Sequence, residues 1–177
     1  LGEARRRDGR PAEALPAFRE AGRLAAARGD VEAMISVDHN RALVLQQLGR
    51  CKSAQRLLES CRNQARRAEL RAEEVRALSG LAALANSQPD RRAPIRLCRR
   101  ALELARQHHL REGQVDAAIN LARLLRDVGR ARAAIVVLDS VRRYSARSHN
   151  AADYAIEQAL CHEAAHGPLA AEAWFRL

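Results

Sequence analysis

The stretch VGRARAAI (residues 128–135) repeats the pattern of LGRCKSAQ (residues 48–55) eighty positions earlier in the chain. Two further stretches, DGRPAEAL and QPDRRAPI, fall into the same frame. Each of the four carries a residue that favours a turn, and these residues recur at a period of forty: Gly9, Gly49, Pro89 and Gly129. A fixed period of this length is typical of a repeat architecture, in which one supersecondary unit is copied along the chain.

The residues that follow each turn also keep one frame. Small residues come five positions after the turn, larger ones nine positions after it, and mostly small ones twelve positions after it. The four sets of three are Ala14, Phe18 and Ala21; Ala54, Leu58 and Cys61; Pro94, Cys98 and Ala101; and Ala134, Leu138 and Val141. Spacings of four and three place each set on one face of a helix, and we expect these faces to be mostly buried.

Another helix is predicted between each of these and the next. Asp30 is expected to cap a helix over residues 31–48, and Asn150 one over residues 151–166. Pro16 predicts a kink or a late start in its helix. Each forty-residue unit is then a pair of antiparallel helices, and the pairs must stack to bury their apolar faces. We expect an all-α solenoid with about nine or ten helices and no strand.

Composition agrees with this prediction. Alanine, leucine, arginine and glutamate favour helix, whereas aromatic residues make up only 3% of the 177 residues. No apolar run reaches the roughly 18 residues that a membrane span needs. The net charge of +10 comes almost entirely from arginine, which indicates a GC-rich bacterial genome and predicts attraction to acidic partners. The four cysteines lack C-x2-C spacing, so we expect free, buried thiols in a reducing cytoplasm.

The pattern resembles the tetratricopeptide repeat (TPR). Leu1-Gly2 ahead of Gly9, and the stretches NRALVLQQLG (residues 40–49) and NLARLLRDVG (residues 120–129), resemble the first helix of that motif and the turn after it. The unit of forty is longer than the usual 34 and resembles long-unit repeats of kinesin light chains and of bacterial regulators. The resemblance implies one right-handed solenoid domain over residues 1–177, with units that turn near residues 9, 49, 89, 129 and 167. Because the chain starts and ends in half-units, we expect it to be part of a longer protein.

The resemblance also implies a concave groove, lined by the first helix of each unit, that binds a peptide. Asn40 and Asn120 occupy the position whose asparagine often bonds a bound peptide's backbone, and Gly80 interrupts that ladder in the middle unit. Further residues at groove-facing positions are Gln47, Arg76, Asn86, Arg123 and Arg126. Their arginines predict an acidic peptide. The alternative is that these side chains are merely solvated on an exposed helix face.

The string His162-Glu163-Ala-Ala-His166 has the spacing of a zinc metalloprotease motif. Two histidines one turn apart can bind zinc, but a catalytic site needs a third protein ligand. Glu172 is the only acidic residue that follows, and the repeat frame explains the segment without zinc. We therefore expect no bound metal and no cofactor. The other histidines, His39, His108, His109 and His149, are expected to be solvated or to cap helices.

The leading hypothesis is a non-enzymatic module that binds a protein or peptide, in a sensing or scaffolding segment of a larger, cytoplasmic bacterial regulator. Its partners would be a protein or an acidic peptide and other domains of the same chain, with no membrane. A zinc peptidase that uses His162, Glu163 and His166 is one alternative. A basic solenoid that binds nucleic acid is another, but stacking aromatics are scarce, so we do not expect nucleic acid as the partner.

Overall fold

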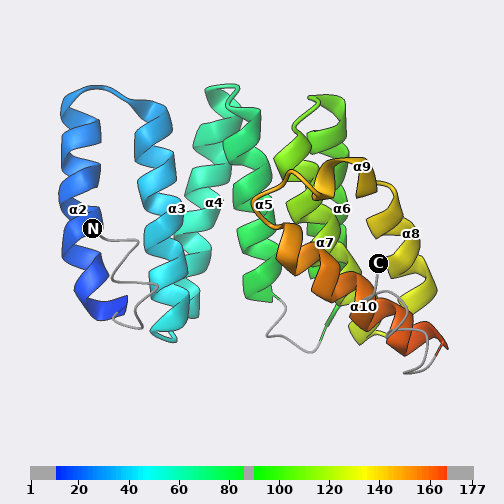
Figure 1. Ribbon diagram of the computed structural model, residues 1–177. Coiled ribbons are helices and arrows are strands. Elements are labelled where there is room, and N and C mark those ends of the chain that lie inside the picture. The colour runs from blue at the N-terminus through cyan, green and yellow to red at the C-terminus, as the bar shows by residue number, and fades with distance from the viewer. Residues whose placement is uncertain (1–10, 86–89, 167–177) are drawn as a thin grey trace. The chain divides into compact units, whose positions relative to one another are not determined.

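The computed structural model of the chain describes residues 11–85 and 90–166 (Figure 1). Within these ranges every regular element is an α-helix, which confirms the all-α prediction. The nine helices are α2 (Pro11–Ala27), α3 (Val31–Gln47), α4 (Cys51–Arg67), α5 (Arg71–Ala85), α6 (Arg92–Gln107), α7 (Arg111–Asp127), α8 (Ala131–Asp139), α9 (Arg142–Ser145) and α10 (Ala151–His166). None of them combines the length and apolar character that crossing a membrane would take.

The chain divides into two compact units, residues 1–84 and 85–177. Unit 1 contains α2 to α5, and unit 2 contains α6 to α10. In unit 1, α3 packs against both α2 and α4; in unit 2, α7 packs against α6 and α8, and α10 packs on α7 and α8. The forty-residue frame makes α3, α5, α7 and α10 the first helices of their repeats, and α2, α4, α6 and α8 the second helices.

Tight turns join the helices where the period predicted them. Gly49 and Gly129 have positive φ angles of 72° and 74°, a conformation that glycine adopts without strain. After each turn a backbone N–H reaches back to the helix just ended: Arg50 donates to the Leu45 carbonyl and Arg130 to the Leu125 carbonyl, both at 2.8 Å. These bonds satisfy carbonyls at the helix end. The turns expected near Gly9, Pro89 and residue 167 lie outside the described residues.

Two further turns have the same geometry without glycine. Glu69, after α4, and His109, after α6, have φ angles of 56° and 55°. Leu70 donates to the Ala65 carbonyl and Leu110 to the Ala105 carbonyl, both at 2.9 Å. A left-handed conformation at a residue with a side chain is uncommon. Helix-end hydrogen bonds therefore close these turns despite the cost of the left-handed conformation. The sequence has no glycine at these positions from which the turns could be predicted.

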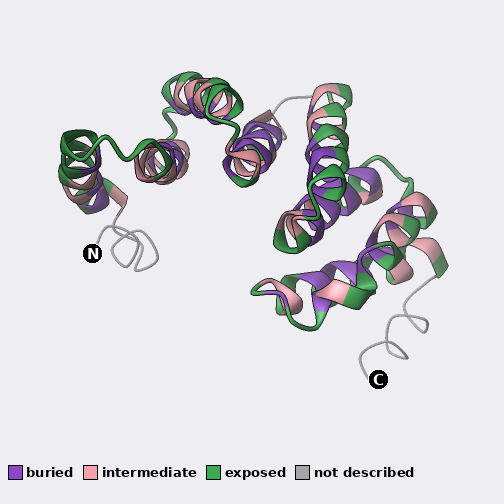
Figure 2. Cartoon of the chain, turned by 90° about the horizontal axis from the view of Figure 1, so that it is seen from above, coloured by how far each residue is buried: buried purple, intermediate pink, exposed green. Residues whose placement is uncertain are grey.

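The core follows the predicted frame. Of the twelve residues in the four sets, all but Ala21 are buried, and Ala21 is half-buried. In unit 1, Ile35 from α3, Cys61 and Ala65 from α4, and Ala77 from α5 form one cluster. Figure 2 shows the buried residues on the sides of helices that face their neighbours within each unit. The predicted core is thus confirmed.

One of the four second helices is broken. α8 ends at Asp139, so Val141 lies beyond it and not on the same helix as Ala134 and Leu138, as the frame had predicted. The Ser140 hydroxyl donates to the Val137 carbonyl at 2.6 Å, and such a bond competes with the helical ladder. Val141 is nevertheless fully buried, so the predicted burial holds although the helix ends before this residue.

A second departure concerns Pro16. α2 begins at Pro11 and continues through Pro16 to Ala27, so the late helix start that Pro16 allowed does not occur. Pro16 is the sixth residue of the helix, close enough to its start that the missing N–H costs little more than one early hydrogen bond.

Candidate functional site

In unit 1 the predicted groove residues share one side of the first helices. Ser36, Asn40 and Gln47 are spaced by four and seven residues, which places them on the same side of α3. Arg76 reaches this side from α5, where its Nη1 donates to the Ser36 hydroxyl at 3.4 Å. Asn40 is half-buried and Gln47 is exposed at the end of α3. The structure therefore brings Asn40 and Arg76 to a common face.

In unit 2 the predicted residues gather on the side of α7 that meets α10. Arg126 Nε lies 2.8 Å from Glu157 Oε1, and Arg123 Nε lies 3.4 Å from Glu157 Oε2. Asn120 is half-buried, one turn before Arg123. The Glu157 side chain is only 2% exposed, so both of its oxygens depend on these arginines. Asn86, the remaining predicted residue, lies outside the described residues.

The groove arginines are occupied by the chain's own carboxylates. Arg76 Nη1 lies 2.8 Å from Glu73 Oε1, just as Arg123 and Arg126 hold Glu157. The first helices are balanced or acidic: α5 carries two arginines and two glutamates, α7 carries three arginines and three carboxylates, and α10 carries three carboxylates and no arginine. The first-helix faces thus have less capacity for an acidic ligand than the sequence alone had suggested.

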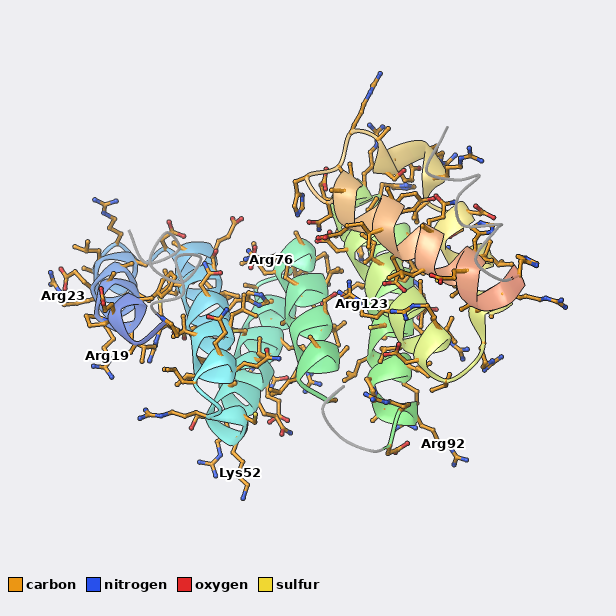
Figure 3. The ribbon with its side chains drawn as sticks, turned by 60° about the horizontal axis from the view of Figure 1, so that its bottom comes forward. Arg19, Arg23, Lys52, Arg76, Arg92 and Arg123 are labelled. Atoms are coloured by element: carbon orange, nitrogen blue, oxygen red, sulfur yellow. The ribbon has the colours of Figure 1, made fainter. Side chains whose placement is uncertain are left out.

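The excess positive charge lies on two second helices instead. α4 carries five basic residues and one glutamate, and α6 carries five arginines and one glutamate. Figure 3 shows Lys52 on α4 and Arg92 on α6 pointing away from the ribbon into solvent. Sequence reasoning overlooked these residues as binding groups, although they follow the same period as the core: Lys52, Arg92 and Arg132 occupy one position of the frame.

The zinc-like motif lies on α10. The His162 and His166 rings are 6.1 Å apart between centroids, and Glu163 is exposed. Burial, and then the neighbouring His166, lower the pKa of His162. Among the described residues, one group of three potential metal ligands lies close together: Glu112, Asp116 and His149. Neither His162 nor His166 belongs to it. No third ligand within the described ranges completes a zinc site, and the peptidase alternative gains no support.

The cysteines are unpaired thiols, and three of the four are buried as expected. Burial raises the pKa of Cys61, Cys98 and Cys161 to about 12, so each of these thiols is protonated near neutral pH. Cys161, next to His162, directs its Sγ toward Glu157 Oε1 at 3.7 Å and not toward the histidine pair. Cys51 is exposed at the start of α4, which corrects the expectation that all four are buried.

A polar cluster joins the start of α7 to the loop before α10. The Ser148 hydroxyl donates to Glu112 Oε2 at 2.7 Å, and His149 Nδ1 lies 2.8 Å from the same oxygen. Asn150 directs its side-chain amide to Asp116 Oδ1. The Ser148 hydrogen bond, and then the charge and hydrogen bonds of His149, lower the pKa of Glu112. The cluster anchors the loop, and the spacing of Glu112 and Asp116 by one helical turn was the only sequence signal of it.

Asn150 directly precedes α10, where the sequence predicts a cap, and its side-chain amide bonds Asp116 on α7. The role expected of one histidine is wrong. His39, expected to be solvated or capping, is buried with 8% exposure between α3 and α5. Asp30, in contrast, caps α3 as predicted, because its Oδ1 accepts from the Ala33 N–H at 2.9 Å.

Comparison with solved structures identifies the fold. A putative kinesin light chain from Podosopora anserina with nearly identical TPR-like repeats is similar over 99% of this chain and 88% of its own, with a TM-score of 0.72 and 16% identity. A related structure of that protein gives a TM-score of 0.71 at the same identity, over 99% of this chain and 89% of its own. BtubC (BKLC) from P. vanneervenii gives a TM-score of 0.76 and 17% identity, over 99% of this chain and 74% of its own.

These likenesses show that the chain has a TPR-like repeat fold, as its sequence predicted. At identities of 16–17% they show the fold alone. No protein-family model matches the sequence, and no curated protein matches it.

Proposed function

We propose that the chain is a non-enzymatic module that binds a protein or peptide. It would serve as a sensing or scaffolding segment of a longer, cytoplasmic regulatory protein of bacteria. The TPR-like fold supports this, because such repeats commonly mediate protein–protein interactions. A fold by itself does not identify a ligand, because recognition depends on particular side chains.

The observation that carries the proposal is the common face of Asn40 and Arg76 in unit 1. The Arg76 bond to Ser36 brings the polar side of α3 and the polar side of α5 together. An asparagine side chain offers both a donor and an acceptor, which matches the N–H and C=O groups of an extended peptide backbone. Asn120 occupies the same position of the frame in unit 2 and would have the same role.

The ion pairs refine the expected ligand. Arg76 already pairs with Glu73 on its own helix, and Arg123 and Arg126 hold Glu157 and so join α7 to α10. Recognition on this side would then depend on amide groups that bond the backbone of the ligand, and less on its charge. The acidic preference that the net charge of +10 suggests would reside elsewhere on the chain.

Selection from a displayed random peptide library on the immobilised protein tests the proposal. Enriched peptides are resynthesised, and their dissociation constants are measured by calorimetry for the wild type, for Asn40→Ala and for Asn120→Ala. We expect at least one of these variants to weaken binding by about tenfold, the effect of losing one or two backbone hydrogen bonds.

Asn63→Ala is the matched control, because Asn63 is an exposed asparagine on the second helix α4. Failure to enrich any peptide would overturn the proposed function. If the enriched peptides bind all three variants as tightly as the wild type, the first-helix asparagines do not contribute to peptide binding.

A further inference from the structure

A hollow of about 550 Å³ lies on unit 2 between α6 and α8. Its lining includes Leu102 from α6 and Leu121 from α7, both of which are buried. Val136 and Val137 line it from α8, and Arg99 and Arg106 line it from α6. An apolar surface and two guanidinium groups therefore meet in one place, and both guanidinium groups come from a second helix.

The apolar part of this hollow is exposed to solvent. Val136 is 69% exposed, more than any other large apolar side chain in the described residues. Val136 lies seven positions after its turn, and the same position in the two preceding copies holds Arg56 and Arg96, whose charged side chains suit a solvated surface. A valine at this position is costly in water and gains from a partner that covers it.

The charged part of the hollow has unused capacity. Glu103, the one glutamate of α6, also lines the hollow, and its carboxylate pairs with Arg100 at 2.8 Å. Arg106 donates to the uncharged Ser140 hydroxyl at 2.6 Å. Within the described residues, no carboxylate forms an ion pair with Arg99 or Arg106. This differs from Arg123 on α7, which already holds a carboxylate of the chain itself.

We propose that this hollow binds a short protein segment in which a leucine-like side chain is flanked by carboxylates. The aliphatic side chain would lie against Val136 and Val137, and the carboxylates would pair with Arg99 and Arg106. Guanidinium groups bind carboxylates with strong, charge-assisted hydrogen bonds. The apolar wall favours such a segment over a nucleic-acid backbone, which would pair with the arginines and leave the valine uncovered. The inference rests on the proposed function and assigns it a second contact surface of defined chemistry.

The test uses a short synthetic peptide, acetylated and amidated, with one leucine between pairs of glutamates. Two companion peptides carry glutamines in place of the glutamates, or alanine in place of the leucine. Each is labelled with a fluorophore and titrated by anisotropy up to millimolar protein. We expect the leucine–glutamate peptide to bind, and each companion peptide to bind several-fold more weakly.

Variants of the protein then locate the site. Arg99→Glu with Arg106→Glu should weaken binding of the leucine–glutamate peptide by about tenfold or more, because two attractive contacts become repulsive. Val136→Asn should weaken it several-fold. The control is Arg92→Glu with Arg96→Glu, which makes the same charge change on exposed positions of α6 outside the hollow and should change the affinity less than threefold.

Absence of binding at millimolar protein overturns this inference. So does a control pair that weakens binding as much as the Arg99 and Arg106 pair, since that would mean general attraction to the basic helix. Equal binding of the glutamine peptide, or tighter binding of a duplex oligonucleotide that is insensitive to Val136→Asn, has the same consequence. If the leucine–glutamate peptide does not bind while library-selected peptides bind in a way that depends on Asn40 or Asn120, this site fails and the proposed function stands.

Discussion

Gly80 on α5 lies directly against Leu58 on α4. A Cβ atom at residue 80 would come within 2.9 Å of Leu58 Cδ2, closer than Cβ atoms come in proteins, and within a tight 3.2 Å of the His39 ring. Leu58 is 1% exposed, so its side chain can yield only by repacking within the core. The helices of unit 1 therefore approach so closely at this point that the asparagine present at the corresponding positions 40 and 120 cannot be accommodated.

Gly80→Ala should lower the free energy of unfolding by about 1 kcal/mol. Overpacking costs about 1–3 kcal/mol, and the gain in helix propensity returns about 1 kcal/mol of it. Gly22→Ala on α2 is the matched control, since its Cβ would lie at an ordinary 3.5 Å from Val37. That variant should be stabilised by up to about 1 kcal/mol. Urea denaturation measures both, and a Gly80→Ala protein that gains as much stability as Gly22→Ala would refute the close contact.

Leu58→Ala and Leu138→Ala should each cost about 2–5 kcal/mol, because both side chains are almost completely buried. In a repeat protein the loss should fall mainly on the mutated repeat and its neighbours. Hydrogen exchange should then show faster exchange around α4 for the first variant and around α8 for the second. A negligible change in stability for both variants would contradict the repeat frame.

The ion pairs between α7 and α10 should be unequal in strength. Arg126→Ala should cost about 3 kcal/mol, because it leaves the buried Glu157 carboxylate without its shortest contact. Arg123→Ala should cost less than about 1 kcal/mol, since this arginine is 46% exposed and lies 3.4 Å from Glu157. Chemical denaturation measures the difference. Equal losses for the two variants would mean that the Arg126 contact is not the dominant one.

Acid should destabilise unit 1 through His39. Burial, and then the charge of Arg76, lower the pKa of His39 from 6.5 to about 4. The unfolded chain therefore binds a proton at this residue that the folded chain does not. This difference in proton binding lowers the free energy of unfolding. The loss is absent above pH 6.5 and grows as the pH falls to about 4, up to about 3 kcal/mol.

His39→Leu should remove this part of the pH dependence. The free energy of unfolding is compared at neutral pH and near pH 4.5 for the variant and the wild type. His108→Gln, at an exposed position after α6, serves as the control and should keep the wild-type difference. A His39→Leu protein that loses stability toward acid as steeply as the wild type would show that other groups are responsible.

The intact protein should hold no stoichiometric zinc. His162 and His166 supply only two ligands from one helix, and a catalytic zinc needs three from the protein. Replacing both with alanine should leave peptide binding unchanged. Elemental analysis that finds about one zinc per chain, lost on His162→Ala, would overturn this prediction and make Glu163 a candidate general base.

Much of the fold was predictable because its signals are local. The spacing of Ala54, Leu58 and Cys61 defines a buried helical face, since three and four residues make about one turn. Gly49 and Gly129 mark turns because glycine adopts a positive φ without strain. Repetition strengthened each of these signals, and the TPR-like resemblance followed from them. The sequence did not predict the left-handed turns at Glu69 and His109, because hydrogen bonds at the helix ends, and not the residue type, impose them.

The side-chain partners were decided only by the tertiary structure. The sequence placed Arg126 at a groove-facing position and could not show that Glu157, thirty-one residues later, would hold it. The burial of His39 and the exposure of Val136 likewise depend on how closely a helix from another part of the chain approaches. Helical periodicity specifies which side chains share a face, but the free energy of a charge or an apolar group depends on what lies opposite that face. The sequence by itself therefore determined the helices and their order, and the packing of the helices decided which charges are neutralised and which remain open to a partner.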